Sequence, residues 1–215
     1  MPCPDSAEMH TLFADATLIV VDKPAGLLAV PGRGEARSDC LAARVAARFT
    51  DALVVHRLDM ATSGLMLFAR GAAAQRALGA AFAERRVGKR YLAVVAGLVE
   101  GEAGTIDLPL AADWPNRPRQ KVDLEAGKPS LTHWRVLSRD PAAGQTRLEL
   151  EPVTGRSHQL RVHLASLGHA IVGDALYAAP EVAARSPRLL LHACQLRFEH
   201  PDDGRRLAFD SPAPF

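Results

Sequence analysis

Short apolar runs separated by turn residues dominate the hydrophobic pattern of the chain. The run LIVVD at 18–22 is rich in β-branched residues and is stopped by Lys23–Pro24 and Gly26, so it predicts a strand. Similar runs recur along the chain, and the last two bracket the turn sequence PDDG at 201–204. The predicted strands cover residues 18–22, 52–58, 65–69, 91–96, 131–137, 146–151, 189–199 and 205–210.

Three segments have a pattern that is typical of helices. In 38–49, Leu41, Val45 and Phe49 recur at helical spacing after a capping residue, Ser38 or Asp39. The segment 72–86 is rich in alanine, and its arginines at 85 and 86 fall in the last turn, where cations suit the helix dipole. The third helix, 157–167, is followed by Gly168, which is placed to end it.

The remaining segments are less regular. Residues 1–10 predict a flexible lead, and 104–123, rich in Pro, Asn and Asp, predicts an irregular segment. Strands outnumber helices and come in hairpin-like pairs, which favours an α+β fold with a mixed, mostly antiparallel central sheet flanked by helices and loops. No linker-like change in composition divides 11–215, so we expect one compact domain there.

The composition is that of an ordinary globular protein, with 48% hydrophobic and 23% charged residues and a formal net charge of +2. Such a charge does not by itself require a nucleic-acid partner. Three cysteines without C-x-x-C spacing argue against a disulfide framework and a thiolate zinc site. The N-terminus is not typical of a signal peptide, and the longest apolar stretch, 92–99, is far shorter than the roughly 20 residues that span a bilayer. We therefore expect a cytoplasmic protein without membrane contact.

The sequence VVHRLDMATSG at 54–64 carries the candidate chemistry. Arg57 and Asp59 are two residues apart at the end of a predicted strand, so their side chains should face the same side, where a guanidinium keeps the carboxylate ionised. Thr62, Ser63 and Gly64 supply hydroxyl and backbone donors in the following loop. An oriented carboxylate in such a loop suits a nucleophile or a base, although an Asx-turn with a structural ion pair would give the same spacing.

The motif HRLDxxTSG closely resembles the catalytic motif of the RluA family of pseudouridine synthases. Four other segments resemble family motifs in the right order: KPAGLLAVPG (23–32), KRYLAVVAG (89–97), GRSHQLRVHLASLGHAIVGDALY (155–177) and LLLHA (189–193). The resemblance covers almost the whole chain and implies the pseudouridine synthase fold, with an active-site cleft across the sheet. The segment DWPNRPRQKVD, the short length and the absence of a leading S4 RNA-binding domain resemble the branch that modifies both 23S ribosomal RNA and a tRNA anticodon stem-loop.

The resemblance assigns a role to four residues. Asp59 matches the catalytic carboxylate, which would attack C1′ or C6 of a uridine or remove a proton from C2′. Tyr91 matches the active-site tyrosine, whose ring can lie against uracil and whose hydroxyl can assist proton transfer at C5. Arg161 matches the arginine that pairs with the catalytic carboxylate. Arg57 matches the arginine that fills the gap left by the flipped base.

The proposed substrate gives the basic residues a role. RNA stem-loops are held through their phosphates and splayed loop bases, which suits the clusters around 85–90 and 117–121. Lys23 and its KPAG turn are expected to shape the wall of the active site. The residues expected to bind RNA are His56, Arg57, Thr62, Lys89, Arg90, Arg117, Arg119, Lys121, Arg156, His158 and Gln159.

The reaction requires neither a redox cofactor nor a metal, and we expect none. His158 and His163 are not spaced as a zinc pair, and neither a P-loop nor a dinucleotide-binding motif is present. His56 is more often structural than catalytic at its position. Two alternatives stay open: a non-catalytic RNA-binding or ribosome-assembly protein on the same fold, and a glycosidase-like hydrolase. The latter normally needs a second carboxylate, and Gly173–Asp174 is interpreted more simply as a turn. No obvious interface stripe is present, so we expect a monomer.

Overall fold

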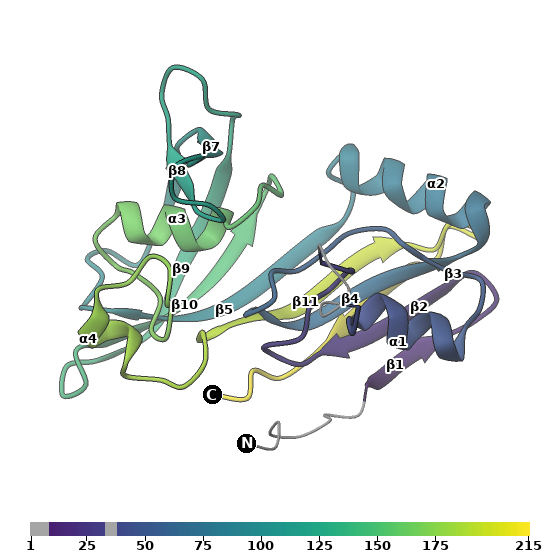
Figure 1. Ribbon diagram of the computed structural model, residues 1–215, viewed down its shortest axis with the longest axis horizontal. Helices are drawn as coiled ribbons and strands as arrows, with labels where there is room; N and C mark the ends of the chain where they lie inside the picture. Colours follow the sequence, from purple (N-terminus) through teal and green to yellow (C-terminus); the bar gives the residue numbers. More distant parts are fainter. Residues whose placement is uncertain (1–8, 33–37) are drawn as a thin grey trace. The chain divides into compact units, whose positions relative to one another are not determined.

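The computed structural model of the protein describes residues 9–32 and 38–215 (Figure 1). The chain forms two compact units. Unit 1 comprises Met1–Val87 and Leu196–Ser211, and unit 2 comprises Gly88–Gln195 and Pro212–Phe215. Most of the predicted lead, residues 1–8, lies outside the described residues, and its last residue, His10, begins a strand.

Unit 1 contains the strand order β1–β2–β4–β11, with β3 paired to β4 and β12 paired to β11, and the pairs β1–β2, β2–β4 and β3–β4 are antiparallel. The apolar patterns at 18–22 and 65–69 correctly predicted β2 and β4, while β1 was missed. The strand bounds are β1 His10–Ala14, β2 Leu18–Lys23, β3 Ala52–Val54, β4 Ser63–Arg70, β11 Leu191–Glu199 and β12 Arg206–Asp210. Only the part of β11 from Leu196 onward belongs to this unit.

Strands β2 and β4 are covered on both faces. Leu18 and Val20 of β2 lie in one apolar cluster with Leu78 of α2, whereas Ile19 and Val21 lie in a second cluster with Leu41 of α1. This alternation follows from the two-residue period of a strand. Because neither face meets water, β4 is buried at every position from Ser63 to Ala69, which explains its continuous apolar sequence.

The two helices of unit 1 are shorter than predicted. Helix α1 spans Leu41–Arg48, and its N-cap is Cys40, whose Sγ accepts a hydrogen bond from the Ala43 N–H; the predicted cap at Ser38 or Asp39 was wrong. Helix α2 spans Gly71–Ala83. Arg85 has a left-handed φ of 61°, so the two arginines predicted for the last helical turn lie beyond the end of the helix.

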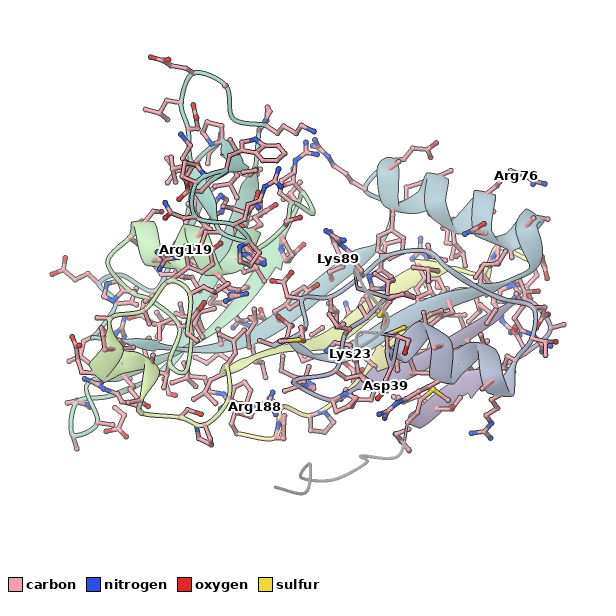
Figure 2. All side chains as sticks on the ribbon, viewed as in Figure 1. Lys23, Asp39, Arg76, Lys89, Arg119 and Arg188 are labelled. Carbon is pink, nitrogen blue, oxygen red and sulfur yellow. The ribbon has the colours of Figure 1, made fainter. Side chains whose placement is uncertain are left out.

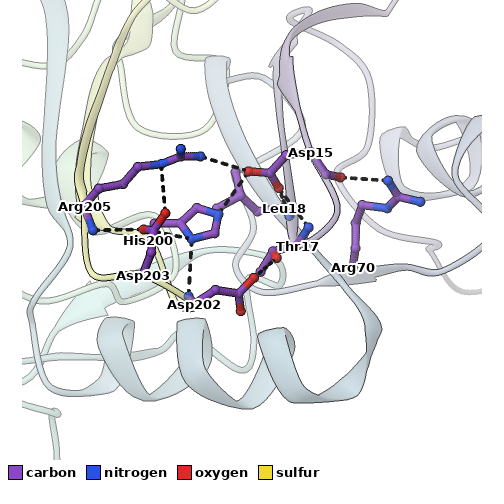
Figure 3. Close-up of polar contacts among 8 residues, drawn as sticks. All are labelled: Asp15, Thr17, Leu18, Arg70, His200, Asp202, Asp203 and Arg205. Atoms are coloured by element: carbon purple, nitrogen blue, oxygen red, sulfur yellow. Dashed lines mark hydrogen bonds and ion pairs between the residues drawn. The ribbon is translucent and has the colours of Figure 1, made fainter.

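A polar cluster joins the β1–β2 turn to the β11–β12 turn within unit 1 (Figure 3). Asp15 accepts hydrogen bonds from the N–H groups of Thr17 and Leu18 at 2.8 and 2.9 Å, and its other oxygen lies 3.0 Å from His200 Nε2. Burial alone would raise the pKa of Asp15, but the hydrogen bonds from Thr17 and Leu18 outweigh it and lower this pKa. The ionised carboxylate therefore holds the C-terminal hairpin against the N-terminal one.

Unit 2 is built on the strand order β11–β5–β10–β9–β6, with a separate two-stranded hairpin, β7–β8. The pairs β5–β10, β9–β10, β6–β9 and β7–β8 are antiparallel. The irregular segment predicted at 104–123 was wrong in part, because three short strands occur there. The strand bounds are β5 Gly88–Ala96, β6 Ala103–Asp107, β7 Leu110–Ala112, β8 Gln120–Val122, β9 Leu131–Asp140 and β10 Gln145–Pro152.

Two helices complete unit 2. Helix α3 spans Gln159–Ser166 and starts two residues later than predicted, because His158 has a left-handed φ of 54°. Gly168, with a φ of 82°, follows this helix as predicted. The short helix α4, Pro180–Ala183, was not predicted. The β-rich content and the largely antiparallel pairing confirm the α+β fold class. Among the described helices, none has the length and apolar character needed to cross a membrane.

Candidate active site

Asp59 lies in the loop between β3 and β4. Strand β3 ends at Val54, earlier than the predicted residue 58, so strand alternation does not set the directions of Arg57 and Asp59. Instead a tight turn follows Asp59, whose carbonyl oxygen accepts the Thr62 N–H at 3.1 Å. Arg57 is exposed, Asp59 is half-buried and Thr62 is buried. The turn therefore gives the carboxylate a fixed backbone position at the start of a buried strand.

Lys23 ties this loop to the KPAG turn. Its side chain has no exposed surface, and Nζ donates to the carbonyl oxygens of Pro24 at 2.8 Å, Leu27 at 2.8 Å and Met60 at 3.0 Å (Figure 2). The Gly26 N–H donates to the same Met60 oxygen at 2.9 Å. These bonds satisfy the buried ammonium group and hold the residue that follows Asp59. The expectation that Lys23 and the KPAG turn shape the wall of the active site stays a prediction.

His56 has a structural environment within unit 1. Its Nε2 accepts the Leu67 N–H at 2.9 Å, and its ring stacks on Phe82 with the ring centroids 4.6 Å apart. An acceptor Nε2 carries no proton, so the ring is neutral in this arrangement. These contacts agree with the expectation that His56 is structural, and its contact with RNA stays a prediction.

Tyr91 lies on β5 of unit 2, directly after two basic residues, Lys89 and Arg90. It is half-buried and pairs with Leu150 of β10. Lys89 lies two residues earlier on the same strand, and successive residues of a strand alternate between its faces, so it shares the face of Tyr91. Arg90 lies on the other face, where Nη1 is 3.4 Å from Glu149. A carboxylate thus already competes for the charge of Arg90, whose predicted contact with phosphate stays untested.

Arg161 of α3 forms a buried, bidentate ion pair with Asp174. Its Nε and Nη2 atoms donate to the two carboxylate oxygens at 2.7 and 2.6 Å, and the two side chains are 5% and 0% exposed. A guanidinium has five N–H donors, and the ion pair with Asp174 uses two of them. The predicted pairing of Arg161 with Asp59 stays a prediction, and the residue that holds Arg161 in unit 2 was missed.

Asp174 is also the turn residue that the sequence indicated. One of its oxygens accepts the N–H groups of Leu176 at 2.9 Å and Tyr177 at 3.2 Å, which is an Asx-turn. The preceding Gly173 has a φ of 79°, and a Cβ atom there would lie 1.9 Å from the carbonyl oxygen of Arg188. The interpretation as a turn is confirmed, and the same carboxylate serves both the turn and the ion pair.

Tyr177 connects several predicted site residues of unit 2, and the sequence reasoning missed it. Its hydroxyl oxygen accepts the Gln120 N–H at 2.8 Å and lies 2.6 Å from Nδ1 of His158. The guanidinium carbons of Arg161 and Arg119 lie 5.1 and 5.7 Å from the centre of its ring. The chain has two tyrosines, each inside a family-like motif, and that signal could have identified Tyr177.

Gln159 is buried and holds the start of α3. Its amide oxygen accepts from Thr154 Oγ1 and the Arg156 N–H, and its amide nitrogen donates to the carbonyl of Leu131 and to Thr132 Oγ1. Four hydrogen bonds at a buried site point to a structural role, and the predicted RNA contact stays untested. Arg156 itself is exposed, and its Nε donates to the Pro129 carbonyl at 3.3 Å.

The basic residues beyond the motifs differ in how they are paired. Arg86 contacts Glu84 at 2.7 Å, and Lys121 contacts Asp123 at 3.0 Å. The hydrogen bond that Lys121 donates to the Asp123 carboxylate, together with the negative charge of that carboxylate, raises the pKa of Lys121. In contrast, neither Arg117 nor Arg119 forms an ion pair with a carboxylate within residues 9–32 and 38–215. These two arginines are therefore the better candidates for phosphate contacts.

His163 is a structural histidine of α3. It is fully buried, with Nδ1 2.9 Å from Thr132 Oγ1 and Nε2 3.0 Å from the Leu108 carbonyl. Burial lowers its pKa, because the charged imidazolium is poorly solvated there. Across the described part of the chain, no group of three or more His, Cys, Asp or Glu side chains is arranged to hold a metal ion.

A family model described as RNA pseudouridylate synthase matches residues 17–166 of the chain, well over half of its length. The chain belongs to the RNA pseudouridylate synthase family. The predicted family membership is thereby confirmed. The matched range of this RNA pseudouridylate synthase includes Asp59, Tyr91 and Arg161, whereas Asp174 and Tyr177 lie beyond it.

Curated relatives are similar over nearly their full length. The dual-specificity RNA pseudouridine synthase RluA of Yersinia pestis is 50% identical over 207 residues, which are 96% of this chain and 100% of that protein. The enzyme of the same name from Escherichia coli strain K12 is 48% identical over 213 residues, which are 99% of this chain and 96% of that protein. The resemblance therefore extends beyond the catalytic motifs.

Solved structures of RNA pseudouridylate synthases share the fold. Human RNA pseudouridylate synthase domain containing 1 matches with a TM-score of 0.82 and 31% identity, covering 100% of this chain and 87% of that one. Human RNA pseudouridylate synthase domain containing 4 matches with a TM-score of 0.75 and 25% identity, covering 95% and 88%. The predicted pseudouridine synthase fold is confirmed.

Proposed function

We propose that this protein converts uridine to pseudouridine in two RNA substrates, 23S ribosomal RNA and a tRNA anticodon stem-loop. The observation that carries the proposal is the identity of about half of all residues, over nearly the full length, to enzymes named dual-specificity RNA pseudouridine synthases. The protein would act in the cytoplasm as a monomer, with residues 11–215 as one catalytic domain made of both units.

The reaction is an isomerisation and needs no net addition or loss of atoms. The bond between N1 of uracil and C1′ of ribose breaks, the uracil rotates, and C5 bonds to C1′. The proton lost from C5 is balanced by one gained at N1. Asp59 would attack C1′ or C6, or would remove a proton from C2′. Its half-buried position in a turn held by Thr62 supports a fixed, oriented carboxylate.

Tyr91 and Arg161 would act on the same uridine as Asp59. The tyrosine ring would lie against uracil, and its hydroxyl would assist proton transfer at C5. The guanidinium of Arg161 would pair with the catalytic carboxylate. The Asp174 pair and the Tyr177 ring support this role, because a guanidinium held on one edge and one face can hold a second anion without losing much conformational freedom.

Incubation with two unmodified transcripts tests the proposed substrates. We expect the protein to form pseudouridine in a tRNA anticodon arm and in a large-subunit rRNA fragment, without an added metal or cofactor. Carbodiimide-based mapping would locate each new pseudouridine. Conversion in only one transcript would remove the dual specificity, and conversion in neither would overturn the proposed function.

Arg57→Ala should reduce activity while leaving the fold intact. Flipping a base costs a few kcal/mol, and an inserted guanidinium would offset part of that cost, so we expect kcat/KM to fall about 10- to 100-fold. Arg57 is exposed, so its removal should leave the thermal unfolding midpoint unchanged. Arg76→Ala is the matched control, because it removes another exposed arginine of the same unit (Figure 2). Near-normal turnover of Arg57→Ala would refute the base-flipping role.

A further inference from the structure

The turn between β7 and β8 presents a tryptophan that folding leaves exposed. Trp114 keeps 67% of its surface accessible, even though the guanidinium carbon of Arg117 lies 3.3 Å from the centre of its ring. Single exposed apolar side chains are common on proteins and need no explanation by themselves. An indole that is stacked on a guanidinium and still largely open is a more specific arrangement, because it is an aromatic platform with an adjacent positive charge.

Backbone hydrogen bonds close this turn. The Asp113 N–H donates to the Arg119 carbonyl at 3.0 Å, the Asn116 N–H to the Asp113 carbonyl at 3.1 Å, and the Arg119 N–H to the Asn116 carbonyl at 3.0 Å. The Asn116 side chain also donates to the Asp113 carboxylate at 2.9 Å. The indole is therefore presented from a closed turn, so binding through it would cost little ordering entropy.

The charges next to Trp114 favour an anionic partner. In the described residues, Arg117 and Arg119 have no carboxylate within ion-pair distance, whereas Lys121 is neutralised by Asp123. Asp113, the nearest acid in the sequence, is engaged by Asn116. Arg117 is stacked on the exposed indole and Arg119 lies in the same turn, and neither has an acidic partner among the described residues. This arrangement matches the chemistry that holds single-stranded RNA, which combines backbone charge with base stacking.

Tyr177 links the β7–β8 hairpin to Arg161 of α3 within the same unit. The Tyr177 hydroxyl oxygen accepts the Gln120 N–H of β8, and the guanidinium carbons of Arg119 and Arg161 lie 5.7 and 5.1 Å from the centre of its ring. A base bound on the hairpin would thus be held at a fixed position relative to α3. This link would let the hairpin affect where the RNA lies in the reaction.

We propose that the exposed indole of Trp114, backed by Arg117, stacks on an unpaired base of the RNA stem-loop and so helps the enzyme select its substrate. The proposal rests on the proposed function and deepens it. Unpaired loop bases are the parts of RNA that proteins stack on aromatic side chains, whereas the bases of a closed duplex are not available. Trp114 therefore distinguishes a stem-loop from a plain duplex of the same stem.

Steady-state kinetics on the anticodon stem-loop tests the platform. Trp114→Ala should raise KM about 5- to 150-fold, the effect expected for loss of one stacked base, while kcat changes less than about threefold. Trp114→Phe should recover part of the loss, because a smaller ring can still stack. Leu124→Ala is the matched control, since Leu124 is 77% exposed two residues after β8 and is apolar without an aromatic ring.

Fluorescence reports the contact directly and does not depend on turnover. The chain has two tryptophans, so Trp134→Phe leaves Trp114 as the sole indole. Stem-loop RNA should quench this emission in a saturable way, and a duplex with the same stem but no loop should not. Equal quenching by both RNAs, or a KM for Trp114→Ala within twofold of the unmodified enzyme, would overturn the proposal. A KM increase as large in Leu124→Ala would overturn it too. These outcomes leave pseudouridine formation by the unmodified enzyme intact, so they are distinct from a failure of the proposed function.

Discussion

Asp59→Asn is expected to abolish pseudouridine formation and to leave RNA binding intact. An amide has the shape of the carboxylate but can neither act as a nucleophile nor take a proton at neutral pH, so we expect the rate to fall at least about 100-fold. The backbone carbonyl of Asp59 still accepts the Thr62 N–H, so the turn should persist. Single-turnover conversion of the stem-loop and a filter-binding Kd measure the two properties separately.

The control for this variant is Asp51→Asn in the same unit. Asp51 is an exposed carboxylate that pairs with Arg70 at 3.1 Å, and its loss removes the same charge at a position without a proposed role. Activity of Asp59→Asn within tenfold of the unmodified protein would contradict the catalytic assignment. An unmodified protein that binds both RNAs but isomerises neither would instead favour the non-catalytic RNA-binding alternative.

Asp174→Ala is expected to lower the free energy of unfolding by about 3–5 kcal/mol. The substitution leaves the guanidinium of Arg161 buried without its carboxylate, and a buried uncompensated charge is costly. The N–H groups of Leu176 and Tyr177 also lose their acceptor, which adds to the loss. Urea unfolding followed by circular dichroism would give the free energy, provided that the slope of the transition stays unchanged.

Two further variants separate the charge of Asp174 from its turn. Asp174→Asn keeps an oxygen for the turn amides and should cost less than the alanine variant. The double variant Asp174→Leu with Arg161→Met removes both charges and should recover more than half of the lost stability, because buried ion pairs contribute little beyond satisfying each other. A loss below about 1 kcal/mol in Asp174→Ala would contradict the structural role of the pair.

The strongest strands could be predicted from the sequence for a simple physical reason. Strands β2 and β4 are apolar at successive positions because both of their faces are packed, and this leaves a clear signal. The apolar pattern of strand β1 is weaker, because its residues HTLFA are half-buried or exposed at the edge of the sheet. The end of helix α2 was predicted three residues too late, since nothing in the sequence AERR at 83–86 marks the left-handed conformation of Arg85.

The segment 104–123 shows the limit of composition as a guide. Its prolines at 109, 115 and 118 indicated an irregular structure, yet the strands β6, β7 and β8, each of five residues or fewer, form before, between and after these prolines. Strand β6 pairs with β9, whose first residue, Leu131, lies far along the sequence. Pairing of strands that are so far apart in the sequence depends on tertiary packing, which cannot be deduced from the local sequence pattern.

Residues of the candidate site could be predicted from the sequence only where they lie in a motif that resembles those of the family. Resemblance to family motifs assigned roles to Asp59, Tyr91 and Arg161, and these roles stay predictions. The partners that hold such residues lie elsewhere in the sequence and come close only in the folded protein. The three carbonyl oxygens around Lys23 and the hydroxyl of Tyr177 belong to this second group. Gln159 was expected to contact RNA because it lies in a motif, and this contact stays a prediction. The four hydrogen bonds that Gln159 forms inside the protein could not be deduced from the motif.

The discontinuous make-up of unit 1 has a consequence for its synthesis in the cell. Leu196 and Phe198 belong to the same apolar cluster as Leu18 and Leu67, so the N-terminal 87 residues cannot complete this cluster alone. The whole segment Gly88–Gln195 is translated in between, which takes about 5–20 s at about 5–20 residues per second. During that interval the apolar side chains that later pack against Leu196 and Phe198 lack this cover, so we expect the nascent chain to be prone to aggregation until β11 has been synthesised.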